Sequence, residues 1–312
     1  MTKVFIDGSA GTTGLRIYER LENRKDINLI ILPDEVRKDI DARREAINSA
    51  DIAFLCLPDD AAIEAVSFIE NENTAIIDTS TAHRTNSDWV YGFPELEGGY
   101  EKIKSSKRIA NPGCHASGFI ALVKPLISAG ILSDDTHLSC FSITGYSGGG
   151  KKMIAEYEDA NRNPLLNAPR QYGLTQQHKH LKEMVALTGI NNAPAFCPIV
   201  APFYSGMEVS VPLFAKDIKG NISDISKIYK EYYKNGLVRF CDSADEGGFL
   251  SAAAFSLRDD MEISISGNDE RIILTARYDN LGKGASGSAI QNMNILMGVD
   301  EKTGLDYIPP AF

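Results

Sequence analysis

The sequence predicts an α/β Rossmann-type nucleotide-binding domain joined to an α+β domain. Over the first 115 residues, short apolar runs alternate with stretches of helical spacing, which is typical of a doubly wound parallel sheet. After about residue 116, longer runs alternate or stay apolar in the way of antiparallel strands. We therefore assign 1–115 to a nucleotide-binding domain, to which 285–312 return, and 116–284 to a substrate and dimerisation domain.

Composition restricts the class of protein before any motif is considered. The 312 residues carry a net charge of −10, which disfavours nucleic acid and anionic membranes as partners. The longest apolar runs are far shorter than the roughly 20 residues that span a bilayer, and the N-terminus has the pattern of a strand. Five scattered cysteines without metal-ligand spacing predict reduced thiols and no metal site. We expect a cytoplasmic protein with no nucleic acid or membrane partner.

A glycine-rich turn follows the first predicted strand, residues 4–6. A predicted helix at 15–21 and a second strand at 28–33 complete a strand–turn–helix–strand unit, which can place a pyrophosphate on a helix N-terminus. The spacing is G-x-x-G-x-x-G and differs from the usual dinucleotide fingerprint, so an ordinary tight turn is the alternative. The candidate cofactor contacts here are Gly8, Ser9, Ala10, Gly11, Thr12, Thr13 and Gly14.

Further strands are predicted at 51–58, 74–78 and 108–110, with a helix at 59–68 after Pro58. In a parallel sheet, the carboxyl ends of these strands meet at one edge, where ligands bind. This places Pro58 near the cofactor and places Ser80 and Arg84 near an anionic group. Arg84 suits a carboxylate or phosphate, although a structural ion pair would explain it equally well.

The run Asn111-Pro112-Gly113-Cys114 is the most informative in the chain. Proline and glycine predict a tight turn, and the apolar run from Phe119 predicts a buried helix directly behind it. A thiol at a helix N-terminus meets unpaired amide groups and the positive end of the helix dipole, which stabilise the nucleophilic thiolate. The alternative is a small buried cysteine without a chemical role.

The second domain is predicted to contain strands at 137–144, 207–214 and 271–278, helices at 177–187 and 223–233, and a last helix at 285–297. His178 and His180, on the helix that starts near Gln176, are candidate acid/base groups. Their i, i+2 spacing points them in different directions and excludes a metal pair. The stretch 146–152 is predicted to be an anion-binding loop or, alternatively, a linker; its candidate substrate contacts are Tyr146, Ser147, Gly148 and Gly149.

These motifs occur in one order along nearly the whole chain: 8–14, 78–84, 90–96, 111–114, 145–152, 178–180 and 279–287. Together they resemble the N-acetyl-gamma-glutamyl-phosphate reductases of arginine biosynthesis in their shorter bacterial form. The resemblance implies a fold of the glyceraldehyde-phosphate and aspartate-semialdehyde dehydrogenase type. It also implies NADPH as cofactor, N-acetylglutamyl phosphate as substrate, and a homodimer or homotetramer.

The resemblance further implies roles for individual residues. Cys114 corresponds to the nucleophile that forms a thioester with the acyl phosphate, and the acid/base histidine is His178 or His180, of which we favour His180. Asn111 and Arg84 are candidates for the phosphate or carboxylate of the substrate. Gly113 and the helix amides behind Cys114 are expected to stabilise the oxyanion.

Two positions depart from the family pattern. His115 stands where a bulky aromatic residue is expected, and it could perturb the thiol. Asp34 ends the second predicted strand, where an acidic residue would bind an NAD ribose and repel a 2′-phosphate, while Arg37 and Lys38 lie close enough to counter it. The alternatives to this assignment are an aspartate-semialdehyde dehydrogenase-like reductase and a non-catalytic nucleotide sensor.

Overall fold

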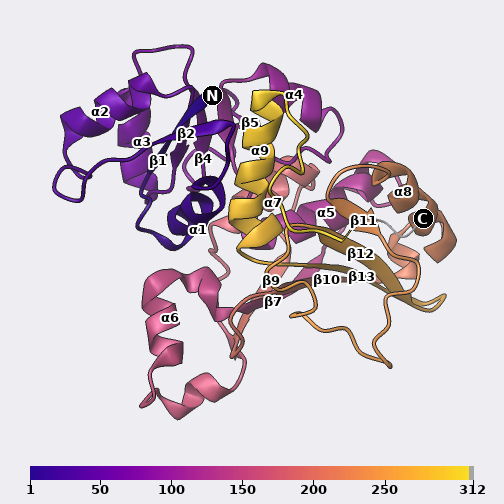
Figure 1. Ribbon diagram of the computed structural model, residues 1–312. Coiled ribbons are helices and arrows are strands. Elements are labelled where there is room, and N and C mark those ends of the chain that lie inside the picture. The colour runs from indigo at the N-terminus through magenta and orange to yellow at the C-terminus, as the bar shows by residue number, and fades with distance from the viewer. Residues whose placement is uncertain (309–312) are drawn as a thin grey trace. The chain divides into compact units, whose positions relative to one another are not determined.

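The computed structural model of the protein describes residues 1–308 (Figure 1). The chain divides into two compact units, the first formed by Met1–Pro112 and Ala285–Leu305 and the second by Gly113–Gly284 with residues 306–308. Residues 113–115 and 306–308 were instead predicted to belong to the nucleotide-binding domain. Its remaining residues, 309–312, lie outside the described residues.

The first unit contains a six-stranded sheet in the order β2-β1-β3-β4-β6-β5. All neighbouring strands are parallel, as predicted for a Rossmann-type domain. The strands are β1 (Thr2–Asp7), β2 (Ile27–Ile30), β3 (Ile52–Leu55), β4 (Ala75–Asp78), β5 (Val90–Tyr91) and β6 (Arg108–Ala110).

Helices cover both faces of this sheet. The small apolar side chains of α2 (Ile40–Ser49) and α3 (Asp59–Ser67) pack with Phe5, Ala53 and Leu55 in one core. The alternate strand residues are buried as well, because the other face is covered too. The remaining helices are α1 (Thr12–Leu21), α4 (Gly99–Ser105) and α9 (Gly287–Met297), and α9 packs against α1, α4 and β4.

The second unit contains a seven-stranded mixed sheet in the order β11-β12-β13-β10-β7-β9-β8. Helix α5 (Cys114–Ser128) packs on β10 and β13, and it also contacts α7 (His180–Thr188) and α8 (Ile222–Tyr232). In Figure 1, α6 (Gly150–Glu158) lies on an extension away from these helices. The strands are β7 (Ser139–Gly145), β8 (Arg170–Gln171), β9 (Ala195–Ala201), β10 (Met207–Phe214), β11 (Val238–Phe240), β12 (Met261–Gly267) and β13 (Arg271–Tyr278).

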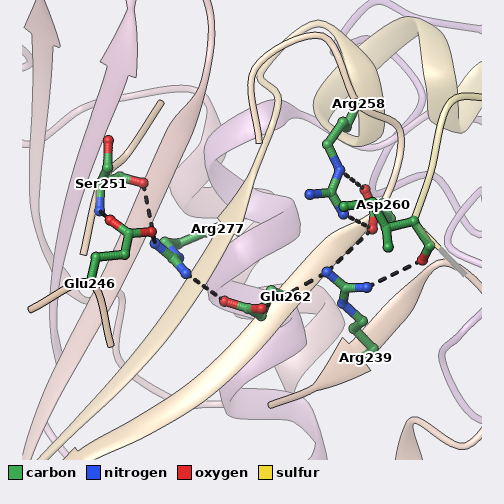
Figure 2. A network of polar contacts seen from close by, with 8 residues as sticks. Arg239, Glu246, Ser251, Arg258, Asp260, Glu262 and Arg277 are labelled. Atoms are coloured by element: carbon green, nitrogen blue, oxygen red, sulfur yellow. Dashed lines mark hydrogen bonds and ion pairs between the residues drawn. The ribbon is translucent and has the colours of Figure 1, made fainter. Parts of the chain in front are cut away.

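A network of charged side chains fixes the segment between β11 and β12 to the sheet (Figure 2). Arg277 on β13 pairs with Glu262 of β12 at 2.7 Å and with Glu246 of the connecting segment at 2.5 Å. The guanidinium carbon of Arg277 lies 5.5 Å from the ring centre of Phe255, which also comes from that segment. Arg277 and Glu262 are both buried, so each compensates the charge of the other. The second ion pair, between Arg277 and Glu246, anchors the long connection to the sheet.

Three predicted boundaries are wrong. The second strand ends at Ile30 rather than at residue 33, and the third ends at Leu55 rather than at residue 58. Helix α7 begins at His180, so His178 lies in the preceding turn and not on the helix. The turn persists because Gln176 has a positive φ of 56° and its side chain bonds to both the amide and the carbonyl of Phe196. Among residues 1–308, no helix is both long and apolar enough to cross a membrane.

Candidate active site

Cys114 is the first residue of α5, as the turn sequence before it predicts. Gly113 occupies the N-cap with extended backbone angles, φ −83° and ψ 143°, so the chain turns into the helix at the cysteine. The thiol is partly exposed, whereas Cys140 is buried and its pKa is raised by burial. The position of Cys114 is therefore the one at which helix amides favour a thiolate.

The amide of Gly113 donates to the Glu183 side chain at 2.7 Å. Glu183 lies in the first turn of α7 and is buried, with 2% of its surface exposed. This contact corrects the expectation that the Gly113 amide stabilises an oxyanion, because the amide is already engaged. Sequence reasoning missed Glu183, although its position three residues after His180 would have been a usable signal.

A second loop approaches the cysteine from the end of β13. The Asp279 carboxylate accepts hydrogen bonds from the amides of Leu281 and Gly282, which turns the chain sharply. A Cβ atom at Gly284 would lie 3.0 Å from the Cβ of Cys114. Glycine at this position lets the loop lie directly against the nucleophile candidate.

Three imidazole rings cluster around His115, the residue that follows Cys114 in α5. The ring centres of His178 and His180 are 4.8 Å apart, and that of His115 lies 5.5 Å from His180 and 5.8 Å from His178. His180 is buried at the N-terminus of α7, and its amide donates to Nδ1 of His178 at 3.3 Å. The structure thus brings the predicted histidines together and adds His115 to them.

His115 is held by hydrogen bonds at both ring nitrogens. Nδ1 lies 2.6 Å from Ser142 Oγ on β7, and Nε2 lies 2.6 Å from the Tyr172 hydroxyl. Burial, with a smaller contribution from His178, lowers the pKa of His115 to about 3. Burial and Lys179 lower the pKa of His178 as well. His115 is therefore a neutral, fixed ring at neutral pH, and not a second general acid.

The low pKa of His115 predicts a loss of stability in acid. The unfolded chain binds the proton below about pH 6.5 and the folded chain only near 3, so protonation favours unfolding within that window. The free energy of unfolding should fall by about 1.4 kcal/mol per pH unit below pH 6.5 through this residue. We expect urea unfolding at about pH 7 and about pH 5 to show a weaker pH dependence in His115→Phe than in the unaltered protein. Equal pH dependence in the two proteins would contradict the assignment.

The glycine-rich turn of the first unit has the geometry of a phosphate-binding loop. Gly8 has a φ of +85°, and a Cβ there would lie 2.3 Å from the carbonyl oxygen of Cys56. A Cβ at Gly14 would lie 2.4 Å from the Gly8 carbonyl oxygen. The Thr12 hydroxyl, in the first turn of α1, is buried and has no hydrogen-bond partner within residues 1–308. A tight backbone turn, a helix N-terminus and an unsatisfied hydroxyl together fit a dinucleotide pyrophosphate.

A cavity of about 310 Å³ opens beside this turn. It is bounded by the ends of β1 and β2 and by the segment that precedes α2. Of the predicted cofactor contacts, Gly8, Ser9, Ala10, Arg37 and Lys38 line it, and Pro58 is the N-cap residue of α3. Asp34 does not end β2, because that strand stops earlier, and its largely exposed carboxylate lies 3.4 Å from Arg37.

The predicted substrate contacts of the first unit are engaged within it. Arg84 donates to the carbonyls of Asn111 and Thr79, and the Asn111 side chain donates to the carbonyl of Ala285. The Ser80 hydroxyl donates to Asp78 at 2.7 Å. These bonds shape the loops at the strand ends, and contact of the three residues with substrate stays a prediction.

Residues 146–149 form a short 3₁₀ turn, and Lys151 and Lys152 belong to α6. The amides of Tyr146 and Ser147 donate to the carbonyls of Phe203 and Tyr204, so these two amides are engaged. The Ser147 hydroxyl is buried and accepts from Asn280 at 3.0 Å. Gly148 and Gly149 are exposed beside it, and their role in binding an anion stays a prediction.

Comparison with known proteins adds an independent line of evidence. Residues 114–280 match the family described as semialdehyde dehydrogenase, dimerisation domain, and residues 33–106 match semialdehyde dehydrogenase, NAD binding domain. The chain is 43% identical over 318 residues to N-acetyl-gamma-glutamyl-phosphate reductase 2 of Nostoc sp., covering 97% of this chain and 99% of the relative. It is 43% identical over 306 residues to N-acetyl-gamma-glutamyl-phosphate reductase of Brucella ovis, covering 95% of this chain and 99% of the relative.

Solved structures show the same fold at lower identity. Aspartate semialdehyde dehydrogenase II from Vibrio cholerae, complexed with ASA, aligns with a TM-score of 0.72 at 17% identity, covering 96% of this chain and 98% of that one. Aspartate semialdehyde dehydrogenase with NADP from Candida albicans aligns with a TM-score of 0.66 at 16% identity, covering 95% of this chain and 98% of that one. The predicted fold class is confirmed by these structures together with the family matches.

Proposed function

The chain belongs to the N-acetyl-gamma-glutamyl-phosphate reductase family, and from this membership we propose that it reduces N-acetyl-L-glutamyl 5-phosphate to N-acetyl-L-glutamate 5-semialdehyde, a step of arginine biosynthesis. The observation that carries the proposal is Cys114 at the first position of α5, followed by His115, whose ring lies 5.8 Å from that of His178 and 5.5 Å from that of His180. A nucleophile and an acid/base are the groups that the protein itself supplies to an acyl phosphate reduction, whose hydride comes from the cofactor.

The proposed reaction begins at the thiolate. Cys114 Sγ attacks the acyl carbon, the carbon–oxygen bond to phosphate breaks, and phosphate leaves with the electron pair, so that a thioester remains on the cysteine. When bound, a reduced nicotinamide supplies the hydride that converts this thioester to a thiohemiacetal. His180 donates a proton to the developing oxygen and takes it back as the carbon–sulfur bond breaks and the aldehyde forms. Amides of the first turn of α5 stabilise the oxyanion in this scheme.

The nicotinamide cofactor is proposed to be NADP rather than NAD. Both Arg37 and Lys38 line the cavity beside the glycine-rich turn, where they suit a 2′-phosphate. Asp34, the residue that would repel this phosphate, is absent from the cavity lining and lies within ion-pair distance of Arg37.

Removing these two cations should impair NADPH binding selectively. We expect Arg37→Ala combined with Lys38→Ala to raise the KM for NADPH about 10- to 100-fold, through the loss of charge-assisted hydrogen bonds, and to change the KM for NADH by less than about threefold. Arg44→Ala is the matched control, because Arg44 pairs with Asp41 on α2 and does not line the cavity. Equal changes for both cofactors would count against this contact.

We propose a cytoplasmic homodimer or homotetramer that uses the dimerisation domain. The face of the seven-stranded sheet opposite α5 carries Phe141, Phe214 and Ile273, which are 45%, 56% and 42% exposed. Strand pairing places all three on one side of the sheet, so they form an apolar strip suited to a second copy. Light scattering should give two or four times the chain mass of 34.1 kDa.

The reaction is tested most simply in reverse. Purified protein is mixed with N-acetylglutamate 5-semialdehyde, inorganic phosphate and NADP or NAD, and reduced nicotinamide is followed by absorbance. Phosphate-dependent reduction of NADP, well above NAD, supports reaction, substrate and cofactor together. Activity with NAD alone would contradict the cofactor, and activity on aspartate semialdehyde alone would contradict the substrate.

A further inference from the structure

The hydroxyl of Tyr278 is inserted beside the first turn of the helix that carries the nucleophile. Tyr278, at the end of β13, is fully buried. Its oxygen accepts a hydrogen bond from the amide of Gly118 at 3.0 Å, and its proton is donated to the carbonyl of Cys114. In an α-helix, the amide of residue 118 pairs with the carbonyl of residue 114. The Tyr278 hydroxyl therefore contacts both groups of one helical amide–carbonyl pair.

Gly118 makes this arrangement possible. A Cβ at this position would lie 2.7 Å from the Tyr278 hydroxyl oxygen and 2.8 Å from the Cβ of Val209 on β10. Any larger residue would therefore push the helix away from the sheet or displace the hydroxyl. The close approach and the two hydrogen bonds fix the backbone of Cys114 relative to β13.

The phenol keeps its proton throughout the working range. Burial, with a smaller contribution from Cys114, raises the pKa of Tyr278 well above its ordinary value. It can therefore donate to the Cys114 carbonyl whether or not the thiol is ionised. The contact is a constant restraint on the nucleophile and not a titrating switch.

We propose that Tyr278 is a positioning residue for Cys114, whose hydroxyl clamps the first turn of α5 and so sets the direction from which the thiolate attacks. The proposal rests on the proposed role of Cys114 as nucleophile. A displacement of a reacting group by about 1 Å can lower the rate about 100-fold. Loss of the restraint on the first turn of α5 should therefore lower the reaction rate measurably. Tyr278 acts through the backbone of Cys114 in this account, and no contact with substrate is required.

The structure offers a matched control on the same helix. Tyr229 is also fully buried, and its hydroxyl donates to the carbonyl of Leu122 at 2.6 Å, eight residues beyond Cys114 in α5. Tyr278→Phe and Tyr229→Phe each delete one buried hydroxyl that binds the backbone of α5. Tyr278→Phe removes two hydrogen bonds and Tyr229→Phe removes one, so the melting temperature of each variant is measured and reactivity is compared well below both, where each protein is folded.

The test compares the two variants in the absence and presence of substrate. Without substrate or cofactor, the rate of alkylation of Cys114 by iodoacetamide is followed by peptide mass spectrometry. With substrate, kcat and KM are measured. We expect Tyr278→Phe to lower both the alkylation rate and kcat by about tenfold or more with little change in KM, and Tyr229→Phe to leave all three within about twofold.

The proposal would be overturned if Tyr278→Phe had the alkylation rate and kcat of the unaltered protein. It would also be overturned if both variants lost alkylation rate and kcat equally. Because alkylation requires neither substrate nor cofactor, its result is independent of the proposed reaction. A failure of the reaction assay in the unaltered protein would contradict the proposed function and leave the alkylation comparison interpretable.

Discussion

Replacing Cys114 with serine should reduce phosphate-dependent oxidation of the semialdehyde by at least about 1,000-fold. A serine hydroxyl at the N-terminus of α5 remains protonated at neutral pH and cannot replace the thiolate that the helix amides favour. The side chains are nearly the same size, so the fold should be retained, which circular dichroism and the melting temperature can verify. The measurement is the steady-state rate of NADP reduction with and without phosphate.

Cys241→Ser is the control for this variant, because Cys241 is another partly exposed free thiol that follows β11 in the same unit. It should keep its activity within about twofold. Near-normal turnover in Cys114→Ser, or an equal loss in Cys241→Ser, would remove the covalent mechanism from consideration.

Replacing His180 with asparagine should lower kcat by about 100- to 10,000-fold, the usual range for the loss of a general acid/base. His180 is buried in the first turn of α7, the turn that also supplies Glu183 to the amide preceding Cys114. His178 lies before the helix, and its Nδ1 already accepts the His180 amide. These contacts favour His180 as the proton-transfer group and His178 as a residue that supports it.

His178→Asn is therefore the matched variant, with an expected loss of no more than about tenfold in kcat and an unchanged shape of the pH–rate profile. The His180→Asn profile should lose the limb that reports the acid/base. If the two variants behaved in the reverse order, His178 would take the catalytic role.

Much of the fold follows from local sequence signals. The glycine-rich turn between an apolar run and a helical run predicted the first βα unit, and Asn-Pro-Gly predicted that a helix would begin at the cysteine. Helix α2 was not predicted, because it is mostly polar and buries only Arg43, Ala46 and Ile47. The start of α7 was misplaced, because the backbone bonds made by the Gln176 side chain involve a strand 20 residues away.

The candidate site was predictable only in part, for a similar reason. Cys114, His178 and His180 were identified because cysteine and histidine have distinctive chemistry and occur in recognisable runs. The environment of His115 was not predicted, because Ser142 and Tyr172, which form hydrogen bonds with its ring, lie 27 and 57 residues further along the chain. The Glu183 contact with the Gly113 amide spans 70 residues. Such contacts depend on how α5, α7 and the sheet pack together, and no local pattern encodes them.

Trapping the acyl group on Cys114 tests the proposed thioester directly. The protein is mixed with N-acetylglutamate 5-semialdehyde and NADP in the absence of phosphate, quenched in acid and analysed by peptide mass spectrometry. We expect a burst of reduced nicotinamide close to one equivalent per subunit, and an N-acetylglutamyl group on the peptide that contains Cys114, which added phosphate removes. Sustained phosphate-dependent turnover without such an adduct, or with the adduct on another residue, would contradict the proposed thioester.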